Sequence, residues 1–151
     1  GKRNGVWYRI DEYYYDSRRE GAQRTDEEHY AGLVELCGGR RIECVVVDPS
    51  AASFMETIRR HGAYRVLPAE NDVLDGIRRV SVALKQGEIK ICANCADTIR
   101  EFGLYRWADV AGKDAPLKEN DHAMDDIRYF VASLQRETDD FCAVSVARRE
   151  E

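Results

Sequence analysis

The sequence predicts an α/β domain whose sheet is covered by helices on both faces. Short runs of β-branched and aromatic residues alternate with longer segments in which apolar residues recur at helical spacing, as they do in α/β folds. Residues 44–47 are apolar at every position, which is typical of a strand buried on both faces in the middle of a sheet. Asp48 follows this strand directly, at the end where open α/β sheets bind their ligands.

The N-terminal part is predicted to begin with a hairpin. Val6–Tyr15 is rich in aromatic and β-branched residues and is predicted as a strand, and the Asn4-Gly5 dipeptide before it is typical of a hairpin turn. Because such a turn implies a partner strand upstream, we expect a sheet that lacks one of its strands. Thr25 and Glu28 then form the pattern of a capping box, at the start of a helix that ends at Gly38-Gly39.

The rest of the chain is predicted to alternate between helices and short strands. The expected helices begin at Ser50 or Ser53, at Asn71 or Asp72, at Asn94 and at Asp121. Ile99, Phe102 and Tyr105 recur at helical spacing in the third of these helices. Residues 64–67 and 88–92 are predicted strands, and residues 108–119 a loop. The last helix is expected to end near Leu134, followed by a C-terminal tail over residues 135–151.

Length and composition are those of one soluble domain. The chain has 151 residues, of which 44% are hydrophobic and 34% charged, and no apolar stretch approaches transmembrane length. Five cysteines without framework spacing indicate reduced thiols and an intracellular protein. The net charge of −5 argues against a tight, sequence-reading DNA-binding protein. The sequence also lacks the glycine-rich phosphate loop of nucleotide-hydrolysing motors.

Asp48 and a downstream acidic cluster are the candidate site. Asp121 and Asp125 are four residues apart at the start of the last helix, so they share a face of that helix. His122 is the residue after Asp121 and lies beside this face. If this helix start meets the end of the central strand, the carboxylates and the imidazole form a ligand set for Mg²⁺ or Mn²⁺. Two simpler interpretations stay open: Asp48 caps the turn that follows it, and the acidic residues complement the helix dipole.

Three segments resemble the nuclease domain of phage terminase large subunits, most of all its PBSX-type branch. They are Val46–Phe54, Ala69–Ile77 and Lys118–Tyr129, and the similarity extends over roughly residues 1–132 in the expected order. The resemblance implies an RNase H-like mixed sheet flanked by helices. The first carboxylate of the family lies on a strand upstream of the hairpin, so residues 1–134 would form a nuclease domain that lacks its first strand and is truncated at its N-terminus.

The resemblance also implies an activity and roles for individual residues. Members of the family are Mg²⁺- or Mn²⁺-dependent endonucleases that cut concatemeric double-stranded phage DNA. Asp48 matches the second metal-binding position and His122 the third, with Asp121 and Asp125 as helpers at a two-metal site. Lys113 and Lys118, near this site in the sequence, are candidate contacts to the DNA backbone.

The same resemblance indicates partners and leaves alternatives for the function. In an intact system the expected partners are DNA, the terminase ATPase domain, the small terminase subunit and the portal, in the cytoplasm of a bacterial host and without a membrane. One alternative is a catalytically incomplete interaction module of the packaging machinery, inactive because the first catalytic carboxylate is absent. Another is a different RNase H-like nuclease, such as a junction resolvase.

Overall fold

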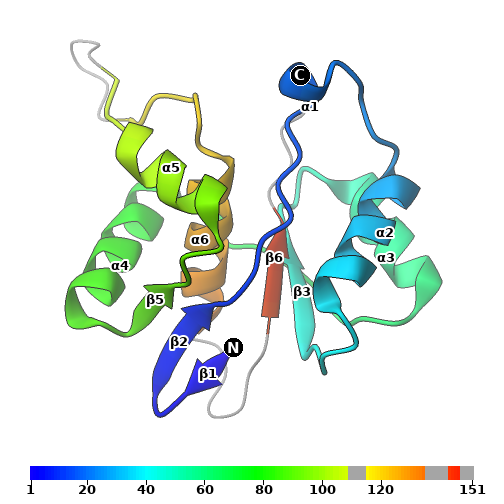
Figure 1. Ribbon diagram of the computed structural model, residues 1–151, viewed down its shortest axis with the longest axis horizontal. Coiled ribbons are helices and arrows are strands. Elements are labelled where there is room, and N and C mark those ends of the chain that lie inside the picture. The colour runs from blue at the N-terminus through cyan, green and yellow to red at the C-terminus, as the bar shows by residue number, and fades with distance from the viewer. Residues whose placement is uncertain (109–114, 135–142, 147–151) are drawn as a thin grey trace.

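The strands form two small sheets flanked by helices (Figure 1). The computed structural model describes residues 1–108 and 115–134 and the backbone of residues 143–146. In one sheet the order is β1 (Lys2–Arg3), β2 (Val6–Arg9) and β5 (Ile89–Ile91). In the other it is β4 (Val66–Pro68), β3 (Cys44–Val47) and β6 (Ala143–Val146). Only β1 and β2 pair antiparallel among these strands, so the predicted mixed α/β architecture is confirmed.

The central strand β3 is buried on both faces, as its four apolar residues predict. Each of its side chains is 0% exposed. Cys44 and Val46 belong to one hydrophobic cluster, which includes Met124 and Ile127 of the last helix. Val45 and Val47 belong to a second cluster on the opposite face. Alternation along a strand therefore divides the core into two layers, and Asp48 follows at the carboxyl end between them.

Strand β6 is the main departure from the predicted organisation. Ala143–Val146 pairs in parallel with the whole of β3, from Cys44 opposite Ala143 to Val47 opposite Val146. The prediction of a tail is therefore wrong for these four residues, whereas residues 135–142 and 147–151 lie outside the described parts of the chain. Parallel strands need a long connection, so no local turn marks the pairing in the sequence. The edge of β3 opposite β4 thus has a partner strand.

The predicted hairpin forms, but its second strand is shorter than expected. Asn4 and Gly5 have φ values of 52° and 77°, and Lys2–Arg3 supplies the partner strand within the chain. The hairpin turn therefore has a partner within the chain, but that partner is only two residues long. The strand ends at Arg9 and not at Tyr15, and the chain leaves the sheet after Arg9. The side-chain amide of Asn94 donates to the carbonyl of Ile10, where a sheet partner would otherwise bond.

The helices follow the predicted order with one addition. They are α1 (Ser17–Glu20), α2 (Asp26–Cys37), α3 (Ala52–His61), α4 (Val73–Gln86), α5 (Ala96–Leu104) and α6 (His122–Ser133). The addition is the single turn of α1, which the sequence does not predict. The capping box of Thr25 and Glu28 and the cap by Asp72 are confirmed. None of the helices in the described ranges is long and apolar enough to cross a membrane.

One prediction about a helix start is wrong, and one apolar stripe is only partly covered. Neither Ser50 nor Ser53 caps α3, because its N-cap is Ala51, which makes no side-chain cap bond. Of the three apolar residues at helical spacing here, Ile99 and Phe102 of α5 are 49% and 37% exposed, whereas Tyr105 is partly buried against the core. Helical spacing of apolar residues identifies a stripe on a helix, but it does not establish that another element covers that stripe.

Candidate functional site

Asp48 is held in place by hydrogen bonds at the carboxyl end of β3. One carboxylate oxygen, Oδ2, accepts a bond of 2.6 Å from the hydroxyl of Tyr129. The other, Oδ1, accepts bonds of 2.9 Å from both the backbone N–H and the hydroxyl of Ser50. Partial burial by itself raises the pKa of Asp48, but these bonds and the charge of Arg128 outweigh it and leave the pKa below its ordinary value. Asp48 is therefore a fixed, ionised carboxylate.

Helix α6 brings a buried cation to the same place. Arg128 is 4% exposed and forms an ion pair with Asp125, one turn earlier in the helix. Its Nη1 donates to the backbone carbonyl of Asp72 at 3.2 Å, and its guanidinium lies 5.2 Å from the ring centroid of Tyr129. The Nε atom of Arg128 is buried and has no hydrogen-bond partner within the described residues. One guanidinium thus acts electrostatically on both Asp48 and Asp125.

The two carboxylates are shifted in opposite directions. Burial raises the pKa of Asp125, and the ion pair with Arg128 offsets this only in part. The nearby charge of Asp121 raises the pKa of Asp125 further. The predicted proximity of Asp121 and Asp125 at the start of α6 is thereby confirmed, and Asp121 is the N-cap residue of the helix. A lowered pKa beside a raised one is a frequent property of functional sites.

His122 lies at the first position of α6 and is not among the residues that bond to Asp48. Its ring is in an edge-on contact with Tyr14, with ring centroids 6.2 Å apart. The hydrogen bond that links α6 to Asp48 comes from Tyr129 and not from His122. Across residues 1–108 and 115–134, no group of three or more His, Cys, Asp or Glu side chains is arranged to hold a metal ion.

Of the two candidate DNA-contacting lysines, one is described. Lys118 is exposed, and its charge lowers the pKa of Asp125, which indicates that it lies on the side of the acidic cluster. Lys113 lies outside the described residues. The position of Lys118 is therefore compatible with a role near the site, while that of Lys113 stays a prediction.

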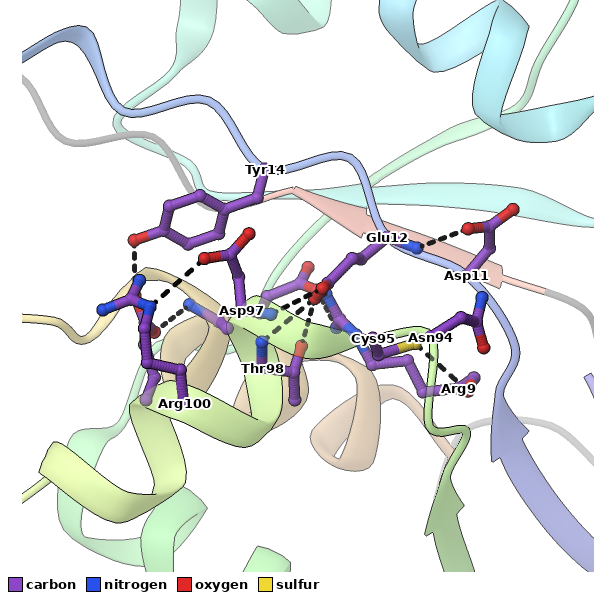
Figure 2. Close-up of polar contacts among 12 residues, drawn as sticks. Arg9, Asp11, Glu12, Tyr14, Asn94, Cys95, Asp97, Thr98 and Arg100 are labelled. Atoms are coloured by element: carbon purple, nitrogen blue, oxygen red, sulfur yellow. Dashed lines mark hydrogen bonds and ion pairs between the residues drawn. The ribbon is translucent and has the colours of Figure 1, made fainter. Parts of the chain in front are cut away.

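The start of helix α5 is capped by a residue distant in the sequence (Figure 2). The carboxylate of Glu12 accepts bonds from the backbone N–H groups of Asp97 and Thr98 at 2.7 and 3.0 Å, and from the Thr98 hydroxyl at 2.7 Å. The helix's own N-cap residue, Cys95, makes no side-chain cap bond. Nearby, Arg9 of β2 forms a partly buried ion pair with Asp126 of α6.

The start of α6 is capped in the same way, from α5. Glu101 is 0% exposed, and its carboxylate accepts a bond of 2.7 Å from the backbone N–H of Ala123 and one of 2.6 Å from the Tyr14 hydroxyl. Asp121, the N-cap residue of α6, makes no side-chain cap bond of its own. Buried Glu101 therefore fixes the helix end that carries the predicted acidic residues.

Comparison with known proteins gives consistent results in sequence and in structure. No family model matches the chain. The large terminase subunit of Escherichia phage T5 is 27% identical over 135 residues, which cover 85% of this chain and 31% of that protein. The large terminase of a thermophilic bacteriophage in complex with ADP is 44% identical, with a TM-score of 0.86 over 89% of this chain and 35% of that one. The complex of the same terminase with ATP-gamma-S gives 45% identity and a TM-score of 0.83, over 87% and 34% of the two chains.

These relatives agree with the RNase H-like fold expected from the three matching segments. The chain spans about a third of the length of the relatives that it matches. Over this third of their length, the chain belongs with the large subunits of phage terminases in both sequence and fold.

Proposed function

We propose that this chain is the nuclease domain of a terminase large subunit and hydrolyses phosphodiester bonds of concatemeric double-stranded DNA during packaging. The observation that carries the proposal is Asp48, an ionised carboxylate fixed at the carboxyl end of the central strand beside helix α6. Ligands of open α/β sheets bind beyond this end of the strands. The similarity to large terminases supports the DNA-packaging role.

A divalent metal ion would suit the chemical types of the predicted site residues, although the described side chains do not form a ready-made metal site. Carboxylate oxygens of Asp48, Asp121 and Asp125 are hard ligands of the kind that Mg²⁺ prefers, and an imidazole from His122 would favour Mn²⁺. One or two such ions would stabilise the charge that develops on the phosphate and make a bound water more acidic.

The chain's own residues orient the carboxylate that would receive the ion. A carboxylate has about four lone-pair sites. On Asp48, Oδ1 uses two of these sites for Ser50, and Oδ2 uses one for Tyr129. One site on Oδ2 therefore stays open to a cation. Because Tyr129 and Ser50 already fix the rotation of the side chain, little conformational entropy is lost when Asp48 binds.

An interaction module of the packaging machinery is the second candidate function. It is favoured by the exposed apolar side chains of α5 and the segment after it, Ile99 at 49%, Phe102 at 37% and Trp107 at 50%. Exposed apolar side chains close together commonly belong to protein interfaces. In an intact system we propose the ATPase domain, the small subunit and the portal as partners, in the cytoplasm of the bacterial host.

Nicking of supercoiled plasmid by this chain tests the proposal. We expect cleavage in Mn²⁺ or Mg²⁺, none in a chelator, and a loss of at least about 100-fold in Asp48→Asn, the size expected for an essential group. Asp75→Asn is the matched control, because Asp75 is a carboxylate of α4 in a surface ion pair with Arg79. His122→Ala tests whether the imidazole takes part.

Two outcomes would contradict the nuclease proposal. Cleavage that persists in Asp48→Asn or in the chelator would show that the activity does not come from this site. A folded chain that binds Mn²⁺ but cuts no DNA, even at high protein concentration, would favour the interaction module.

A further inference from the structure

The segment between β2 and α2 lies at the same edge of the molecule as Asp48. Helix α2 ends just before β3 begins, so the start of α2 lies near the end of β3, and α1 lies beyond that end (Figure 1). Ring contacts connect this segment with the residues after Asp48. The rings of Tyr15 and His29 of α2 meet edge-on with their centroids 5.7 Å apart. The rings of His29 and Phe54, in the first turn of α3, do the same at 6.3 Å.

This segment, here called the Tyr13–Arg24 loop, is tied down at both ends. The ring of Tyr13 packs against Gly32 of α2 so closely that a Cβ there would lie 2.7 Å from two of its ring atoms. The hydroxyl of Tyr15 donates to the carbonyl of Ala22 at 2.6 Å, which closes the loop on itself. These contacts hold the loop in one conformation, so its side chains are pre-organised for binding.

Three guanidinium groups project from the loop. Arg24 lies with its guanidinium 4.4 Å from the ring centroid of Tyr15 and donates to the Tyr13 hydroxyl at 2.7 Å. Arg18 and Arg19 are exposed on α1, and their backbone N–H groups bond to Asp16. No carboxylate of the described residues lies within ion-pair distance of these three arginines, which is true of Arg41 and Arg78 as well but not of Arg60.

We propose that the Tyr13–Arg24 loop binds the phosphate backbone of double-stranded DNA. Guanidinium groups match phosphates in geometry and charge, and an arginine stacked on a tyrosine is held ready to donate. On a chain with a net charge of −5, these three cations lie at the edge that carries Asp48 and none has an ion pair with a described carboxylate, although the charge of Glu28 acts on Arg24 at longer range. The identity of the polyanion as DNA rests on the proposed function, whereas the location of the surface rests on the geometry of the loop.

The test measures binding without cleavage. The probe is a fluorescent DNA duplex of mixed sequence, about 30 base pairs long, and anisotropy is recorded in a chelator at about 50 and 150 mM salt. We expect Arg18→Ala/Arg19→Ala to weaken binding about 5- to 20-fold at the lower salt and to make the salt dependence less steep by about two units of the log–log slope. Arg24→Ala should also weaken binding, and it should make the log–log salt dependence less steep by about one unit.

The matched control is Arg41→Ala/Arg78→Ala, which removes the same charge from two exposed arginines elsewhere. Arg41 precedes β3 at its opposite end, and Arg78 is on α4. We expect this control to change the affinity less than about twofold. Equal losses in the two double variants, unchanged binding by Arg18→Ala/Arg19→Ala, or no binding by the unaltered chain would overturn the proposal. Asp48→Asn should still bind the duplex, because Asp48 is not part of the loop. The nicking assay therefore tests the nuclease proposal independently of DNA binding by the loop.

Discussion

Gly76 of α4 and Arg128 of α6 fit together because the glycine has no side chain. A Cβ at Gly76 would lie 2.5 Å from Cγ and 2.7 Å from Cδ of Arg128. The arginine side chain thus passes directly over the α4 backbone to reach the carbonyls of Asn71 and Asp72 at the start of that helix. Since Arg128 also pairs with Asp125, this close approach connects the acidic start of α6 to the start of α4.

Gly76→Ala is expected to destabilise the protein although alanine is the better helix former. Alanine gains about 1 kcal/mol of helix propensity, but moving the buried Arg128 costs more, so we expect a net loss of about 1–3 kcal/mol. Urea denaturation measures the change. Gly103→Ala in α5 is the control, because a Cβ there meets nothing within 4 Å, and it should stabilise. In an Arg128→Ala background the cost of Gly76→Ala should disappear, and a persistent cost would refute the steric explanation.

Tyr129→Phe is expected to remove the bond that fixes Asp48 and to cost about 1–2 kcal/mol at neutral pH. The pKa of Asp48 is below its ordinary value in the folded protein, so its contribution to stability is present above the unfolded pKa. That contribution is lost as the pH falls through the folded pKa. The difference between the variant and the unaltered protein should therefore shrink in acid. Tyr8→Phe, whose hydroxyl has no side-chain bond within the described residues, should show little effect at any pH.

Glu101→Gln is expected to lower the free energy of unfolding by about 2–4 kcal/mol. The carboxylate offers one acceptor oxygen to each of two donors, whereas an amide has only one acceptor oxygen. The Tyr14 hydroxyl and the Ala123 N–H would compete for that acceptor. Thermal or urea unfolding measures the loss. Glu35→Gln on the exposed side of α2 is the control and should stay within about 0.5 kcal/mol of the unaltered protein. A loss equal to that of the control would mean that Glu101 does not cap α6.

Removal of residues 135–151 is expected to leave β3 with one open edge. Its four residues pair with β6 on that side, and an open edge of a buried apolar strand favours self-association. We expect faster hydrogen exchange at the β3 amides and concentration-dependent association, measured by mass spectrometry and light scattering. A monomer with unchanged exchange in β3 would show that β6 does not cover this edge in solution.

Local chemistry is what the sequence predicts well in this chain. Four consecutive apolar residues predict the buried strand β3, and the Thr25–Glu28 pair predicts the start of α2, because each signal is complete within a few residues. Strand β6 and the outward face of α5 are not predicted, because both depend on which element lies next to them in space. The same distinction separates Asp48, recognisable from its place after a strand, from the residues that hold it.

No local pattern in the sequence marks the residues that hold Asp48 in place. Arg128 and Tyr129 lie three and four residues after Asp125, on a helix whose other buried positions are mainly apolar. A polar residue on an apolar helix face indicates a buried bond, but the partner of that bond is distant in the sequence. Asp48 is 81 residues from Tyr129, and only the fold brings them together.

The caps supplied by Glu12 and Glu101 couple parts of the molecule that could otherwise loosen one at a time. Glu12 lies 85 residues before Asp97, so the first turn of α5 is complete only when the chain after β2 has docked. Helix α5 in turn supplies Glu101 to α6, and α6 supplies Tyr129 to Asp48. Release of Glu12 or Glu101 removes the acceptor on which the start of the next helix depends, and displacement of α6 removes the donor that holds Asp48. The amides of Asp97, Thr98 and Ala123 should therefore open to solvent together, as one cooperative unit that includes the candidate site.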